Sequence, residues 1–343
     1  MFCLDKHENT LSLRYKMNSK EDFTKLENIL FPFYVERRNL VQKNNTRFVH
    51  YTTAECATSI IRNKEIWMRE ASCMNDFMEV EHGLGCLRTA YNKKEADEKT
   101  FAKNGLKLAL DEIYPNFSEE VQNFFNGWQS ELKYGTYLSC FSEHKNAEDI
   151  NGRLSMWRAY GGKNGVAIVI KNHAFLSAED NSPIAASPVE YLNDENFSLR
   201  LNKIAENIRD EKIFLRGFNK QHLVGYIFNS LKYASICTKH PGFKEELEWR
   251  LLYTPKIDGE TRHIKKSVEC INSTPQTVYR VPLKNNLFIN LFNIEVPQLL
   301  DRVIIGPTEF PLAIKKAFVD ILKNAGIREP EEKIYISDIP LRS

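Results

Sequence analysis

The sequence predicts an α+β fold, in which helices pack on a mixed, mostly antiparallel sheet. Strand-like stretches are spread from residue 47 to residue 340, and amphipathic helical patterns lie between them. No internal repeat or long Pro/Gly/Ser linker divides the chain. We therefore expect one domain over residues 46–343 with a helical insertion near 196–238, preceded by a helical N-terminal extension over residues 1–45.

The individual elements follow from local patterns of apolar residues. Runs that are rich in aromatic or β-branched residues, or continuously apolar, favour strands at 47–53, 65–70, 136–143, 165–171, 248–255, 302–307 and 334–341. Apolar residues at helical spacing favour helices at 19–30, 56–64, 76–91, 96–133, 197–237 and 312–326.

Two helix starts carry capping signals. Thr52 and Glu55 have the spacing of a capping box before the helix at 56–64, and Asp76 and Glu79 repeat that spacing further along. Asn75 stands just before the second helix. Its amide is a candidate ligand contact, because a helix N-terminus attracts a diphosphate; a purely structural Asn-Asp turn is the alternative.

Charge, apolar runs and cysteine spacing indicate which classes of protein the sequence does not resemble. The 47 basic side chains nearly cancel the 45 acidic ones, so the net charge of +2 gives no global attraction to nucleic acid or to anionic membranes. Charges interrupt the N-terminal apolar residues, and no run of about 18 apolar residues occurs. The seven cysteines form no C-x-x-C pair. We expect a cytoplasmic protein without a membrane span or a metal site.

Strand 47–53 offers the first candidate residues. Alternation places Phe48, His50 and Thr52 on one face, and Val49 and Tyr51 on the other. In the functional interpretation His50 bonds a ribose hydroxyl and Thr52 assists at the adjacent turn. In the structural alternative His50 is a satisfied core histidine and Thr52 only caps the helix.

The strand near residue 250 offers the second set. Glu246, Glu248 and Arg250 share one face, and three charges there need water, pairing or a ligand. A Glu248 carboxylate suits the stabilisation of an oxocarbenium-like charge, as in glycosidases. The structural alternative is a solvated ion pair between Glu248 and Arg250, which contributes little.

The segment SMWRAYGGKNG offers the third set. Trp157 and Tyr160 lie three residues apart, so on a helix they share a face from which one ring can stack on nicotinamide or adenine. Arg158 is a candidate phosphate contact. The alternatives are aromatic core packing for the rings and an exposed surface position for Arg158.

Several phrases together resemble a bacterial family known as domain of unknown function 2971. They are HYTTAECATSIIRNKEIWMREASCMNDFMEVEHGL, YLSCFSE, MWRAYGGKNGVAIVI, KHPGFKEELEWRLLY, VIIGPTEF and SDIPLR. The resemblance covers residues 46–343. The family's phrase Phe-Asn-Asp-Pro-Phe-Glu is altered here to Met-Asn-Asp-Phe-Met-Glu over residues 74–79.

A more distant resemblance is to ADP-ribosyltransferase-like folds, and it rests on a His-Tyr-Thr strand followed by a helix and a strand. It implies an enzyme that consumes NAD, either an ADP-ribosyltransferase or an NAD glycohydrolase. A protein or nucleic-acid acceptor would make it a transferase of the toxin or phage-defence kind. The implied catalytic residues are His50 and Glu248, which should converge in one cleft. The implied NAD-binding residues are Tyr51, Thr52, Asn75, Trp157, Arg158, Tyr160 and Arg250.

Two alternatives belong to other classes of protein. One is a non-catalytic nucleotide-sensing or protein-interaction module, which binds its ligand without turnover. The other is a nucleic-acid-processing protein, which rests on scattered basic residues, namely Lys239, Arg262, Lys265 and Lys266.

Overall fold

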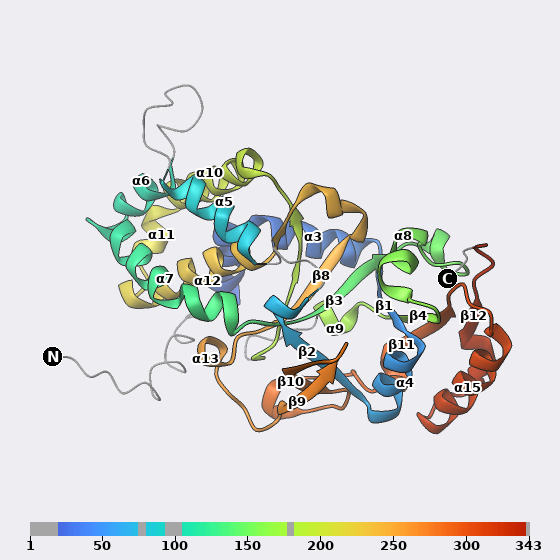
Figure 1. Cartoon of the computed structure of the whole chain (residues 1–343). Coiled ribbons are helices and arrows are strands. Elements are labelled where there is room, and N and C mark those ends of the chain that lie inside the picture. The colour runs from blue at the N-terminus through green and yellow to red at the C-terminus, as the bar shows by residue number, and fades with distance from the viewer. Residues whose placement is uncertain (1–19, 75–79, 93–104, 177–181, 341–343) are drawn as a thin grey trace.

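The computed structural model describes residues 20–74, 80–92, 105–176 and 182–340. Figure 1 shows a central twisted sheet, with a lobe of helices on one side and a smaller group formed by α4, α15, β11 and β12 on the other. The predicted class is confirmed, since the fold is α+β with a mostly antiparallel mixed sheet.

The main sheet runs in the order β12-β11-β4-β1-β3-β2-β10-β9, and β8 joins it on β3 and in turn pairs with β5. Within the described part of this sheet, only β11 and β12 pair in parallel. The strands are β1 Arg47–Thr53, β2 Glu65–Glu70, β3 Tyr137–His144, β4 Gly165–Ile170, β5 Ala185–Pro188, β8 Glu248–Tyr253, β9 Lys265–Ile271, β10 Thr274–Pro282, β11 Leu300–Ile305 and β12 Ile334–Ile336. A separate parallel pair joins β6 Glu190–Tyr191 to β7 Thr238–Lys239.

The longer helices are α2 Lys20–Leu30, α3 Pro32–Lys43, α4 Ala54–Asn63, α5 Glu81–Asn92, α6 Leu106–Asp111, α7 Phe117–Tyr134, α10 Asp194–Asp210, α11 Lys212–Arg216, α12 Lys220–Ile236 and α15 Pro311–Asn324. The short helical turns used below are α8 Leu154–Met156, η3 Trp157–Gly161, η4 Pro241–Glu246, α13 Pro255–Asp258 and η5 Leu287–Ile289. No helix in the described ranges has both the length and the apolar character that crossing a bilayer requires.

The helical lobe is built from two stretches of chain. Helices α10–α12 occupy the predicted insertion, and they share one apolar core with α5–α7, which come earlier in the sequence, and with α2. Two strand residues, Leu138 and Leu252, complete that core from the sheet. The lobe is therefore joined to the sheet through β3 and β8.

The two faces of the sheet carry different residues. The face that we call the His50 face points to α4 and α15, and it carries Phe48, His50, Phe141 and Trp249. The opposite face, which we call the Glu248 face, carries Val49, Tyr51, Cys140, Ser142, Glu248 and Arg250. These assignments follow from the register, because directly paired residues share a face and successive residues alternate.

One predicted helix start is wrong by a residue. Thr53, not Thr52, is the N-cap of α4, and its side chain accepts a hydrogen bond from the Cys56 backbone N–H. The reason is strand pairing: β1 stays in register with β4 as far as Thr53 opposite Gly165. Asn75, Asp76 and Glu79 lie outside the described residues.

Candidate functional site

A group of paired charges lies at the amino end of β8, and we call it the Glu248 cluster. The Lys239 ammonium donates to the Glu246 carboxylate at 2.8 Å and to the Glu248 carboxylate at 3.2 Å. The Arg250 Nε donates to the other Glu248 oxygen at 2.9 Å. The Tyr160 hydroxyl donates to Glu246 at 2.8 Å. The cluster therefore holds two carboxylates and two cations, with one phenol at its edge.

The cluster is buried between two apolar cores. Leu138 and Leu252 belong to the core of the helical lobe, while Val49 and Tyr51 belong to a second core around Trp157. Glu248 and Lys239 are each only 4% exposed, and Arg250 is fully buried. Glu246 and Tyr160 are only partly buried, so solvent reaches the cluster from their side.

Several elements position the cluster. β8 continues the register of β3, so Glu248 lies opposite Ser142 and Arg250 lies opposite Cys140. Leu247 has a left-handed backbone (φ 47°), and this turn lets both Glu246 and Glu248 reach Lys239 at the end of β7. The Tyr191 hydroxyl accepts a hydrogen bond from the Glu248 backbone N–H at 2.8 Å.

The surroundings fix the ionisation of these groups. Burial on its own raises the pKa of a carboxyl, but the charges of Arg250 and Lys239 outweigh it and hold the pKa of Glu248 well below its usual range. Burial, together with the nearby Glu246 carboxylate, raises the pKa of the Tyr160 phenol. At neutral pH Glu248 is thus an anion and Tyr160 a neutral hydrogen-bond donor.

His50 does not join this cluster, so the predicted convergence of His50 and Glu248 in one cleft is wrong. The His50 Nδ1–H donates to the Cys140 carbonyl at 2.9 Å, and burial lowers the pKa of the ring. Its side chain lines an apolar cavity of about 30 Å³ on the His50 face, which is room for about one water molecule and not for a nicotinamide ring. The sheet itself separates the two side chains.

Trp157 and Tyr51 reach the correct face but pack as core residues. The Trp157 ring is 2% exposed, its Nε1–H donates to the Asn151 carbonyl, and it meets Tyr51 edge-on at 4.8 Å. A Cβ added at Gly306 would lie 2.8 Å from this ring, so the backbone packs directly on it. Neither face of Trp157 is free to stack on a ligand.

The other predicted NAD contacts differ in position. Arg158 is exposed, while Tyr160, three residues beyond Trp157, contacts the cluster. Thr52 points to the His50 face by the alternation of β1. Arg250 faces the cluster and pairs with Glu248. Asn75 falls among the residues that the structure does not describe.

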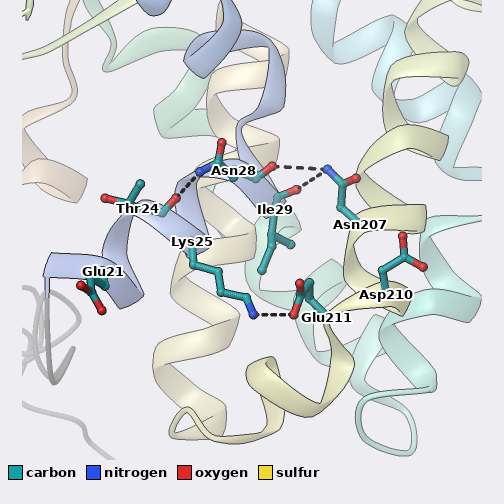
Figure 2. Close-up of a pocket in the computed structure, with 8 residues that line it drawn as sticks. All are labelled: Glu21, Thr24, Lys25, Asn28, Ile29, Asn207, Asp210 and Glu211. Carbon is teal, nitrogen blue, oxygen red and sulfur yellow. Dashed lines mark hydrogen bonds and ion pairs between the residues drawn. The ribbon is translucent and has the colours of Figure 1, made fainter.

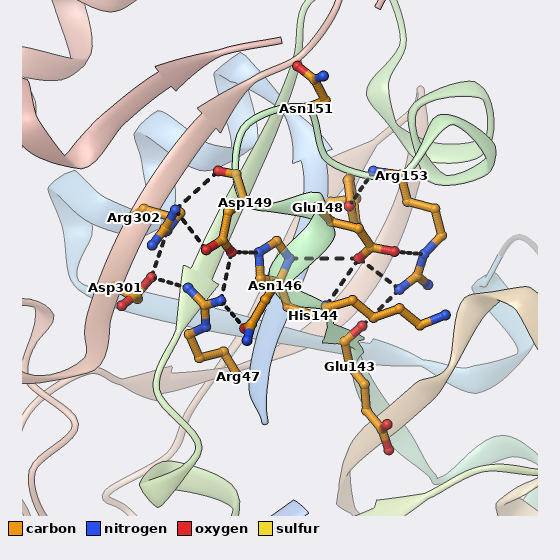
Figure 3. Close-up of polar contacts among 12 residues, drawn as sticks. Arg47, Glu143, His144, Asn146, Glu148, Asp149, Asn151, Arg153, Asp301 and Arg302 are labelled. Carbon is orange, nitrogen blue, oxygen red and sulfur yellow. Dashed lines mark hydrogen bonds and ion pairs between the residues drawn. The ribbon is translucent and has the colours of Figure 1, made fainter. Parts of the chain in front are cut away.

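A second ionic network adjoins the Glu248 cluster through Arg153, and Figure 3 shows this network. Arg153 pairs with Glu148 and also donates to the carbonyls of Glu245 and Glu246, which lead into β8. The network is extended at the ends of β1, β3 and β11 by Arg47, His144, Asp149, Asp301 and Arg302. Arg153 therefore fixes the backbone from which Glu246 projects.

A groove of about 900 Å³ between α2 and α10 is a poor site for NAD (Figure 2). Its charged lining residues are Glu21, Lys25, Asp210 and Glu211, so three carboxylates stand against one ammonium. Lys25 is paired with Glu211 at 2.7 Å. A diphosphate would meet net negative charge there, which opposes binding.

Comparison with protein families gives one match. Residues 156–251 match the model of a family described as protein of unknown function, DUF2971. The match covers this segment alone, which is therefore similar to the DUF2971 family. It contains Tyr160, Lys239, Glu246, Glu248 and Arg250, so the whole Glu248 cluster lies inside the DUF2971 segment, whereas His50 lies outside it. No curated protein and no solved structure matches the chain significantly.

Sequence reasoning missed the part that Lys239 plays in this DUF2971 segment. The prediction of Lys239, among scattered basic residues, as a nucleic-acid contact is wrong, because Lys239 is buried between two carboxylates. A signal was present: Glu246 and Glu248 lie two residues apart beside an apolar strand, and a buried carboxylate pair requires a nearby cation; the predicted shared strand face is wrong for Glu246, which ends η4 before the turn at Leu247. The sequence did not show which of many lysines would be that cation.

Proposed function

We propose that this protein consumes NAD and that the chemistry takes place at the Glu248 cluster. The observation that carries the proposal is the contact of Lys239 with both carboxylates, which holds two acidic groups close together at the partly open end of a buried site. Reactions at an anomeric carbon commonly use two carboxylates in this way.

The proposed step breaks the bond between the nicotinamide nitrogen and C1′ of the ribose. The bonding electron pair leaves with nicotinamide, and a positive charge develops on the sugar. Glu248, which is ionised and fixed by Arg250, stabilises that charge. Glu246, on the accessible side, takes the proton from water or from an acceptor as the new bond to C1′ forms. Tyr160 orients Glu246.

A second candidate function is a binding module without turnover. It is favoured by the internal pairing of the cluster, since each of Lys239, Glu248 and Arg250 already has a partner of opposite charge and all three are buried. A ligand such as NAD would then contact mainly Tyr160, Glu246 and the exposed Arg158. The two candidates differ in whether nicotinamide is released.

The deciding experiment incubates the purified full chain with NAD and measures free nicotinamide by chromatography. We expect release by the wild type and a loss of about 10²-fold or more in Glu248→Gln, because an electrostatic group at the developing charge is removed. His50→Ala should retain the rate within a few-fold, since His50 lies on the other face.

The matched control is Asp258→Asn, which also removes a carboxylate from a buried lysine, Lys232, at 2.6 Å. It should keep the activity. Nicotinamide release that is unchanged in Glu248→Gln would rule out the proposed step. Binding of NAD without release would select the binding module.

A further inference from the structure

An aromatic pair stands exposed beyond the carboxyl end of β8, away from the Glu248 cluster. The rings of His263 and Phe288 stack at 4.6 Å with an angle of 7° between their planes. Asn286 holds them in place, since its side chain contacts the His263 Nδ1 at 3.4 Å and accepts from the Phe288 backbone N–H at 2.9 Å. The arrangement is therefore pre-formed rather than a mobile side chain on the surface.

The outer side of this pair is open. Phe288 is 76% exposed and the adjacent Leu287 is 77% exposed, so one face of the Phe288 ring rests on His263 and the rest meets solvent. An apolar side chain that stays exposed contributes no burial free energy to folding. Two of them side by side, one with a flat and fixed ring, are typical of a surface that receives a ligand.

Basic residues flank His263 in the sequence. Arg262 precedes His263, and Lys265 and Lys266 follow it at the start of β9, all three exposed. Within the described residues none of these three pairs with a carboxylate, and Lys266 only lies 5.8 Å from the Tyr279 ring. Glu260 is the exposed acid nearest in sequence, so the local charge remains positive although the chain is almost neutral.

We propose that this surface binds single-stranded nucleic acid, with a base stacked on Phe288 and phosphates paired with the cations. We call it the stacking patch, and it comprises Arg262, His263, Lys266, Leu287 and Phe288, whereas Lys265 points to the opposite face of β9. An aromatic platform beside a cationic track is the combination by which proteins hold single strands without reading their sequence. The inference is independent of NAD cleavage, because no residue of the patch belongs to the Glu248 cluster.

A protein strand added to the edge of β9 fits the same surface less well. Adjacent lysines on an edge strand oppose strand addition, because they must be desolvated when a second strand pairs there. A polyanion, in contrast, gains from the charges of Lys266 and Arg262. The positive charge of the stacking patch therefore favours a nucleic acid over an added protein strand.

The test is a titration of fluorescein-labelled thymidine and uridine oligonucleotides, about 12 nucleotides long, followed by fluorescence anisotropy. A duplex of the same length serves for comparison. We expect both single strands to bind more tightly than the duplex, and Phe288→Ala to weaken their binding by about 5- to 100-fold, as loss of one stacked base predicts. Lys266→Gln should reduce the slope of log affinity against log salt by about 0.7, whereas Lys265→Gln, on the opposite face of β9, should change it less.

Two matched controls lie at the other end of the sheet, where α15 packs on β11 and β12. Phe310→Ala removes another phenylalanine that is 60% exposed, and Lys316→Gln removes an exposed lysine of α15. Both should bind like the wild type. Circular dichroism melts check that Phe288→Ala remains folded, as its exposure leads us to expect.

The proposal is overturned if no oligonucleotide binds at about 50 mM salt, where such contacts are strong. It is equally overturned if Phe288→Ala binds as tightly as Phe310→Ala, or if the duplex binds best. A concentration-dependent increase in mass that Phe288→Ala abolishes would instead identify the patch as a contact between copies of the chain.

Discussion

At the scale of single residues, Glu248 combines burial, ionisation and two cationic partners. Removing an ion from water is costly, and the pairing with Arg250 and Lys239 offsets that cost only while both partners remain in place. Replacing a whole group of buried ions by apolar residues of similar volume is often neutral or stabilising, so stability alone does not account for this cluster. This balance is one reason to assign the cluster to function.

The same pairing predicts how stability depends on pH. The pKa of Glu248 is lowered from 4.5 to about 2 in the folded chain, so its ion pairs stabilise the fold above about pH 4.5, and this contribution is lost as the pH falls towards 2. We expect Glu248→Gln to be less stable than the wild type at pH 6, and the difference in free energy of unfolding to shrink between pH 4.5 and 2. Urea denaturation across this range measures it, and a difference independent of pH would contradict the assignment.

The residues of the site were only partly predictable. Alternation within β8 correctly placed Glu248 and Arg250 on one face. Alternation within β1 placed His50 and Tyr51 on opposite faces, which is also correct. What the sequence does not contain is the register between β1 and β8, because both pair with β3 and that register arises only in the folded sheet. For this reason His50 was assigned to the Glu248 side together with Tyr51, although only Tyr51 lies there.

At the scale of elements, α4 shows how strand pairing decides a helix start. Two adjacent threonines, Thr52 and Thr53, compete for the N-cap, and the second one takes it because β1 remains paired with β4 through Thr53.

Substitution of these threonines tests the cap. We expect Thr53→Ala to lower the free energy of unfolding by about 1 kcal/mol, since the Cys56 N–H loses its acceptor. Thr52→Ala serves as the matched variant, and chemical denaturation should show it to be the milder change. Equal losses would mean that the two side chains share the cap.

Some elements gave no clear sequence signal. α3 buries only Val41 among its helical residues, so it lacks a continuous apolar stripe. β9 has exposed residues at 265, 266, 268 and 270, and therefore no apolar alternation. Both form because of their neighbours: β9 by hydrogen bonding to β10, and α3 by following α2 onto the body of the protein. Buried elements such as β4, with all six residues buried, were predictable from composition alone.

At the scale of the whole molecule, the helical lobe depends on a close approach between distant segments. Gly83 of α5 lies so near the Ser235 backbone of α12 that an added Cβ would fall 1.9 Å from the carbonyl oxygen. Gly85, two residues further along the same helix, has nothing within 4 Å of that position.

These two glycines make a matched pair of alanine substitutions. Gly83→Ala should destabilise the chain by about 1–3 kcal/mol, because α5 and α12 must move apart. Gly85→Ala should stabilise it by about 0.5–1 kcal/mol, because alanine favours the helix. Thermal or urea unfolding distinguishes them, and a similar effect of both would show that the lobe is loosely packed.

The plan of the sheet also has a mechanical consequence. One edge of β3 pairs with β8, whereas its other edge pairs with β2 near Leu138 and with β1 beyond Ser142. Strand β3 therefore joins two parts of the sheet, one ending at β9 and the other at β12. A force that moves these two parts of the sheet apart would pass through the backbone of residues 138–142, next to which Glu248 lies. The stiffness of residues 138–142 would therefore set how far the two parts of the sheet can move relative to each other around the Glu248 cluster.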